Sequence, residues 1–144
     1  MNEQTTTVST TPVSLATLMT PSKTVSIDFP DMEGFTVKLC YLARDELMKL
    51  RSRCLKQKFN KKTRAFEEQL DEDTFLVEYV KAIIKDWNGL KYKYLKELML
   101  VNVENMKEDD ELPFTRENAE LLMKNSLDFD TWVTETVGDL ENFT

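Results

Sequence analysis

Carboxylates are the reactive side chains that gather in this sequence, in residues 71–73 and 108–111. A calcium-binding loop would need oxygen ligands at alternating positions, a central glycine and a closing glutamate, and neither cluster has that pattern. The chain contains no histidine, and its two cysteines, Cys40 and Cys54, are isolated. The commonest general base is therefore absent, as is the commonest zinc-site pattern. We predict no catalytic residue, no metal site and no cofactor, and hence a protein that is not an enzyme.

The charge of the chain is unevenly distributed around a net value of -7. Residues 49–64 contain eight Lys or Arg and no acidic residue, whereas residues 104–144 contain twelve Asp or Glu and three Lys or Arg. We expect a patch for self-association or for an acidic partner in the basic run. Its candidate residues are Arg51, Arg53, Lys61, Lys62 and Arg64.

The basic run has two other interpretations. It is a solvated helix face and turn, or it binds nucleic acid, with Phe59 and Phe66 stacking on bases. The acidic remainder of the chain would repel a phosphate backbone, which disfavours nucleic acid.

Aromatic residues supply the candidates for binding a protein partner. Trp87 and Trp132 close two amphipathic stripes, where they pack in the core or form part of an interface. Tyr92 and Tyr94 alternate with lysines, a pattern typical of a surface that is both apolar and soluble. The candidate partner-binding residues are Trp87, Tyr92, Tyr94, Trp132 and Phe143.

The organisation that must position these residues is a flexible, Thr/Ser-rich tail over residues 1–22 and a single domain over residues 23–144. No run of residues is long and apolar enough to span a membrane, and no secretory signal is visible, so we expect no membrane partner. Apolar residues alternate with polar ones over residues 25–29 and 35–41, which predicts a β-hairpin. An isolated hairpin is marginally stable, so its apolar face must rest on helices or on a third strand.

Helical spacing dominates the rest of the chain. We predict helices over residues 43–56 and 71–89, the second capped by Asp71 and ended by a left-handed Gly89. Residues 58–70 between them form a second small hairpin or an ordered loop. A short helix over residues 90–101 and an acidic loop over residues 102–111 follow.

The last two predicted helices begin after Thr115, as N-cap, and near Asp128. Phe114 is placed to fold onto Ala119 as a hydrophobic staple. Apolar residues continue at helical spacing to residue 143, so we expect the last helix to reach the end of the chain and to be packed there. The predicted fold class is α+β, mostly α-helical, with an N-terminal β-hairpin packed on a bundle of about four to five helices.

Four segments in this order carry a resemblance to a known family: FTVKLCYLARDELMKLR, FLVEYVKAIIKDWNGL, ELPFTRENAELLMKN and FDTWVTETVGDLENF. Together they resemble the tail assembly chaperones of long-tailed bacteriophages, over residues 24–143. Members of that family commonly have a helix that ends in a Trp-Gly step, a loop, a helix of the LPFTRENAELL type and a closing aromatic-rich helix.

The resemblance implies a non-enzymatic helper of virion assembly. Such a protein binds and solubilises the tape measure protein, helps to recruit tail tube subunits in the host cytoplasm, and is absent from the mature virion. Two alternatives remain open: a permanent minor tail or connector protein, and a nucleic-acid-binding regulator that uses residues 49–64. Self-association fits the chaperone and the structural protein alike.

Overall fold

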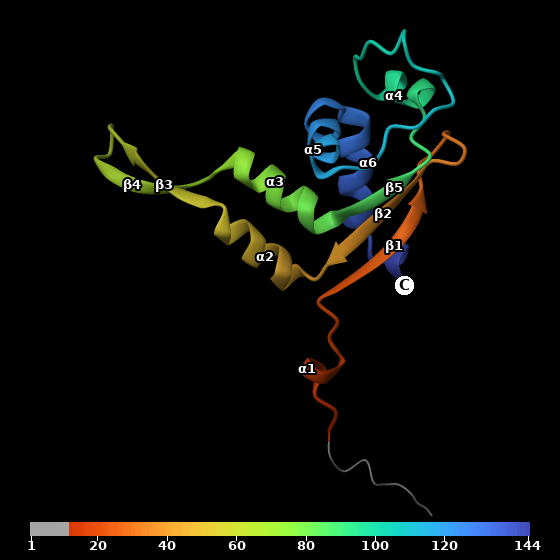
Figure 1. Ribbon diagram of the computed structural model, residues 1–144. Coiled ribbons are helices and arrows are strands. Elements are labelled where there is room, and N and C mark those ends of the chain that lie inside the picture. The colour runs from red at the N-terminus through yellow and green to blue at the C-terminus, as the bar shows by residue number, and fades with distance from the viewer. Residues whose placement is uncertain (1–11) are drawn as a thin grey trace, which may run out of the picture.

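The computed structural model describes residues 12–144 and has the α+β fold that the sequence predicts (Figure 1). Its elements are α1 (Leu15–Leu18), β1 (Ser22–Asp28), β2 (Thr36–Leu42), α2 (Arg44–Arg53), β3 (Leu55–Asn60), β4 (Ala65–Leu70), α3 (Glu72–Ile83), β5 (Ile84–Asn88), α4 (Tyr92–Leu98), α5 (Arg116–Asn125), α6 (Leu127–Val137) and the 3-10 helix η2 (Leu140–Phe143).

The predicted N-terminal hairpin is confirmed and is extended by a third strand. β1 and β2 pair antiparallel, with Val25 opposite Leu39 and Ile27 opposite Val37. β5 pairs with the other edge of β2, so the order of the sheet is β1-β2-β5. The third strand helps to supply the support that an isolated hairpin lacks.

Strand β5 corrects the prediction of one continuous helix over residues 71–89. Helix α3 ends at Ile83, and Ile84 begins the strand. The register places Leu39 opposite Ile84 and Lys38 opposite Asp86, so Lys85 is the extra residue of a β-bulge. The bulge turns Ile84 and Trp87 to the same face although they are three residues apart. Their helical spacing therefore comes from a bulged strand.

Gly89 has the predicted left-handed conformation, with φ +79°, but it follows a strand and does not cap a helix. A Cβ at this position would overlap the carbonyl oxygen of Gly34, in the turn between β1 and β2. Gly89 therefore lets two turns of the main chain approach closely.

Helices cover the sheet in two layers. α3 and α6 pack on β2, and α5 packs on both helices. Between the sheet and these helices lies one apolar core, whose largest fully buried side chains include Phe35, Leu39 and Phe129. Ala119, Leu122 and Met123 form the buried face of α5, as predicted, and the side chain of Thr115 accepts a hydrogen bond from the Asn118 backbone N–H at 3.0 Å.

The last helix is shorter than predicted. α6 ends at Val137, and after Gly138 the chain forms η2. Phe143 remains buried at 2% exposure and packs against Tyr41, with 5.5 Å between ring centroids. The expected packing of the last residues is thus confirmed, through a 3-10 turn.

Of the predicted tail, residues 1–11 lie outside the described part of the chain. Residues 12–21 are exposed and include the single helical turn α1. They lead away from the sheet below the body of the molecule (Figure 1).

Candidate protein-binding surfaces

Strands β3 and β4 form a hairpin that projects from the body beyond the ends of α2 and α3 (Figure 1). We call residues 55–70 the arm. Of the alternatives left open by the sequence for residues 58–70, the structure shows the hairpin. The helix predicted over residues 43–56 was too long, because α2 ends at Arg53 and β3 already begins at Leu55. Within residues 12–144 the strands of the arm pair only with each other, and they add no residue to the core. At the base, the Asp71 backbone N–H donates to the Cys54 carbonyl oxygen at 2.8 Å.

One face of the arm is apolar at both ends. Leu55 lies opposite Leu70 at the base, and Phe59 lies opposite Phe66 near the tip. The two phenylalanine rings meet edge to face, with 5.4 Å between centroids, and are 48% and 69% exposed. This uncovered aromatic pair is unusual for a water-facing surface and suits contact with another molecule.

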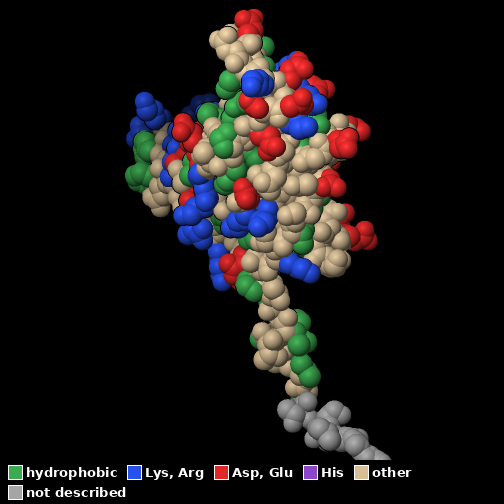
Figure 2. Space-filling view, turned by 45° about the vertical axis from the view of Figure 1, so that its right-hand side comes forward, with side chains coloured by type: hydrophobic (Ala, Val, Ile, Leu, Met, Phe, Trp, Pro, Cys, Tyr) green, Lys and Arg blue, Asp and Glu red, His purple; other side chains and the backbone are tan. Residues whose placement is uncertain are grey.

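The other face and the tip of the arm are basic. Lys56 and Lys58 alternate with the apolar positions and so lie on the opposite face. Lys61, Lys62 and Arg64 occupy the turn, where Arg64 has φ +56°. The arm carries five Lys or Arg against two Glu in a chain whose net charge is -7. Figure 2 shows blue side chains gathered on the left of the view and red ones along the right edge.

The predicted basic patch is divided between two elements. Arg51 and Arg53 lie in the last turn of α2, and Arg53 forms an ion pair of 3.7 Å with Glu78 of α3. Lys61, Lys62 and Arg64 lie at the arm tip. Phe59 and Phe66 share a face that Lys56 and Lys58 do not, so stacking and phosphate contacts would fall on different sides.

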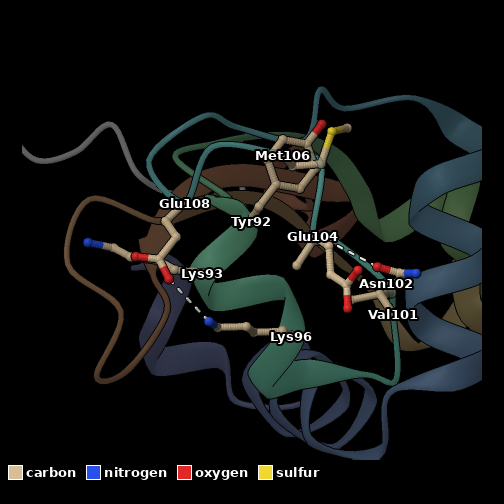
Figure 3. Close-up of a pocket in the computed structure, with 9 residues that line it drawn as sticks. Tyr92, Lys93, Lys96, Val101, Asn102, Glu104, Met106 and Glu108 are labelled. Carbon is tan, nitrogen blue, oxygen red and sulfur yellow. Dashed lines mark hydrogen bonds and ion pairs between the residues drawn. The ribbon is translucent and has the colours of Figure 1, made fainter.

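A second surface is concave and lies between α4 and the loop of residues 99–111 (Figure 3). We call it the α4 groove; its volume is about 420 Å³. Tyr92, Val101, Val103 and Met106 supply its apolar lining. Leu100 is fully exposed and directly follows Met99, the C-cap residue of α4. The groove can receive an apolar side chain of a partner.

Ion pairs close the rim of the α4 groove. Lys96 Nζ lies 3.3 Å from Glu108 Oε1, and Lys93 Nζ lies 3.0 Å from Asp109 Oδ1. The hydrogen bond and charge of Lys93 lower the pKa of the Asp109 carboxyl group, and Asp109 likewise raises the pKa of the Lys93 ammonium group. Both groups are exposed, so these pairs orient the loop more than they stabilise the fold.

The five aromatic candidates fall into different settings. Trp87 is 3% exposed: it donates from Nε1 to the Leu112 carbonyl oxygen at 3.0 Å and packs edge-on against Phe114, with 5.0 Å between centroids. Of its two interpretations, the structure therefore shows core packing. Phe143 is buried as well. Phe114 was predicted to fold onto Ala119; the contact seen for its ring is the edge-on one with Trp87.

Tyr92, Tyr94 and Trp132 are half-buried and keep part of their surface in water. Tyr94 donates from its hydroxyl group to the Glu33 carbonyl oxygen at 2.7 Å, and the Lys93 ammonium group lies 5.6 Å from its ring centroid. Trp132 packs edge-on against Phe29, with 4.8 Å between centroids. Tyr92 lines the α4 groove, so these three remain predicted partner contacts.

The carboxylate clusters have structural roles. Asp71 caps α3 by accepting from the Thr74 backbone N–H at 3.3 Å, and this hydrogen bond lowers the pKa of its carboxyl group. Glu111 accepts from the Gly89 backbone N–H at 2.8 Å. Within residues 12–144, no group of three or more His, Cys, Asp or Glu is placed to hold a metal ion. Within the same range, every helix is too short or too polar to cross a membrane.

One feature of the surface was missed from the sequence. The alternation in residues 55–60 and 65–70 is typical of a hairpin, but the projection of this hairpin from the body depends on tertiary structure alone. Residues 14–19 of the tail suggested a short turn or a segment that docks on a partner, and the structure shows the turn α1 with exposed apolar side chains.

Comparison with known proteins identifies a family. The family model described as YdaY prophage protein matches residues 42–144, which is more than half of the chain. No curated protein and no solved structure matches.

Proposed function

The chain belongs to the YdaY prophage protein family and is therefore phage-derived, and on that premise we propose that it is a tail assembly chaperone. In this role it binds the tape measure protein, keeps that protein soluble, helps to bring tail tube subunits to it, and leaves before the particle matures. It performs no chemical reaction.

The observation that carries this proposal is the arm. It holds two exposed phenylalanines on a projecting ribbon that nothing in residues 12–144 covers. An isolated two-stranded ribbon is marginal in water. A partner that covers the apolar face would gain buried apolar area and would also order the arm.

The charge of the molecule supports the same role. A long apolar helix such as a tape measure protein would aggregate if left uncovered. Copies of a small protein with net charge -7 would lend that client charge and keep coated complexes apart. Many weak contacts along one client give strong overall binding through avidity, while each copy remains displaceable by tube subunits.

The experiment is co-expression with the tape measure protein of the same prophage. We expect the client to move into the soluble fraction and to co-purify. The double substitution Phe59→Ser and Phe66→Ser should abolish both effects. Leu127→Ser, which changes an even more exposed apolar side chain at the start of α6, should leave them intact. A client that stays insoluble with the unaltered protein would refute the proposal.

A further inference from the structure

Residues 13–19 form an apolar segment that lies outside the folded body. Val13, Leu15, Leu18 and Met19 are 58–73% exposed, and the segment carries no charged side chain. In Figure 2 its hydrophobic side chains stand out on the neck below the body. Burial of these four large apolar side chains against another surface would be favourable.

An uncharged groove lies where β2, α2, α3 and α6 meet. We call it the basal groove; its volume is about 210 Å³. Its lining includes Leu42, Leu47, Tyr79, Ile83, Thr134 and Val137. Burial raises the pKa of the Tyr79 hydroxyl group, in keeping with an apolar wall. The basal groove thus matches the segment in polarity.

The segment leaves the domain beside this groove. The Pro21 carbonyl oxygen accepts from the Ala43 backbone N–H at 2.9 Å, and Ala43 directly follows Leu42, a lining residue. Met19 is extended, with φ -65° and ψ 134°, and a proline at position 21 holds Thr20 in the extended region. The chain therefore continues outward, and a reversal into its own groove is disfavoured.

We propose that residues 13–19 of one copy occupy the basal groove of a second copy, reciprocally, in a closed dimer. Because segment and groove lie together on each copy, a two-fold axis beside Pro21 would bring both segment–groove contacts into one interface. Both sides of the contact are uncharged, so two copies of net charge -7 meet where they repel least. This dimer does not depend on the proposed function.

The first test measures the molar mass of the full chain by light scattering at low and high salt. A dimer should persist at high salt, because its contact is apolar. Leu15→Asp with Leu18→Asp should weaken dimerisation by more than about tenfold, from the loss of two buried leucine side chains. Leu127→Asp, at an exposed site on α6, should not. A monomer at all concentrations, or a dimer unaffected by the segment variant, overturns the proposal.

The second test combines Leu18→Cys and Leu47→Cys in the same chain. The natural cysteines are buried, at 3% and 2% exposure, so an added oxidant acts on the introduced pair first. We expect a covalent dimer on denaturing electrophoresis. A cross-linked monomer would show the segment in its own groove, and either that result or the absence of a cross-link overturns the proposal.

Discussion

The three-stranded sheet and the arm have the same antiparallel pairing but opposite surroundings. β2 lies between two strands, and Val37 and Leu39 on its inner face are fully buried under α3 and α6. The arm carries the aromatic pair Phe59 and Phe66, which no other element of residues 12–144 covers. Apolar residues in the sheet stabilise the fold, whereas those in the arm remain available to another molecule. Position in the fold, not strand pattern, separates the two roles.

The largest expected difference between the sheet and the arm is in how much a truncated side chain contributes to the free energy of unfolding. Trp87→Ala in β5 should lower the free energy of unfolding by about 3–5 kcal/mol, because it removes a buried ring and leaves a cavity. Phe66→Ala in the arm should change it by less than about 0.5 kcal/mol. Urea denaturation followed by circular dichroism measures both. Equal losses would mean that the arm belongs to the cooperative unit.

Two left-handed glycines, Gly34 and Gly89, test the close approach of the main chain at the end of the sheet. Gly89→Ala should destabilise the protein by more than about 1 kcal/mol, because the new Cβ would overlap the Gly34 carbonyl oxygen. Gly34→Ala shares the positive φ, +83°, but no atom lies within 4 Å of its Cβ position. Gly34→Ala should therefore lower the thermal unfolding midpoint by less than Gly89→Ala does. The reverse order would contradict the close approach of the two turns.

A smaller effect on the free energy of unfolding is expected at Thr115, the N-cap of α5. Thr115→Ala should cost about 1 kcal/mol, since the Asn118 backbone N–H loses its acceptor. Thr115→Ser keeps the hydroxyl group and serves as the control in chemical denaturation. If Thr115→Ser lowered the free energy of unfolding as much as Thr115→Ala, loss of the hydroxyl hydrogen bond would not be the cause of the destabilisation.

Alkaline pH tests the wall of the basal groove. Burial raises the pKa of Tyr79 in the folded state, so the group favours folding below its unfolded pKa and loses that contribution as pH rises through the folded pKa. Tyr79→Phe should therefore reduce the loss of stability between neutral pH and pH values above the ordinary tyrosine pKa. Parallel unfolding curves for both proteins across this window would contradict the burial of the hydroxyl group.

Charge at the arm tip should alter association without altering stability. Lys61→Glu, Lys62→Glu and Arg64→Glu together should leave the unfolding midpoint nearly unchanged, because all three side chains are exposed. If the tip meets an acidic protein or the acidic part of a second copy, binding should weaken steeply with salt and be lost in this variant. Binding to DNA or RNA at low salt would instead favour the nucleic-acid hypothesis.

Much of the sheet and of the helical core followed from the sequence. The alternation of Val25 and Ile27 with polar residues predicted the hairpin, and the Thr115 cap predicted the start of α5. Strand β5 was missed because a bulge at Lys85 gives Ile84 and Trp87 the spacing of a helix. Periodicity cannot separate these cases, since both place the two side chains on one face.

The candidate surfaces were less accessible to prediction. Residue type favoured Trp87 as a contact, but the Leu112 carbonyl oxygen and the Phe114 ring hold it in the core. Phe66 was predicted only as a residue that could stack on bases, yet its side chain is far more exposed than that of Trp87. Exposure depends on which elements pack together, and local sequence does not encode whether a hairpin is covered.

We propose that this prophage protein shields apolar surface on a tape measure protein through its arm. Pull-down of the co-expressed client with the unaltered protein and with the Phe59→Ser, Phe66→Ser variant tests it most directly. We predict a soluble complex with the first and an insoluble, unbound client with the second. Equal recovery of the client with both proteins would contradict the role of the arm, and recovery with neither would contradict the chaperone function itself.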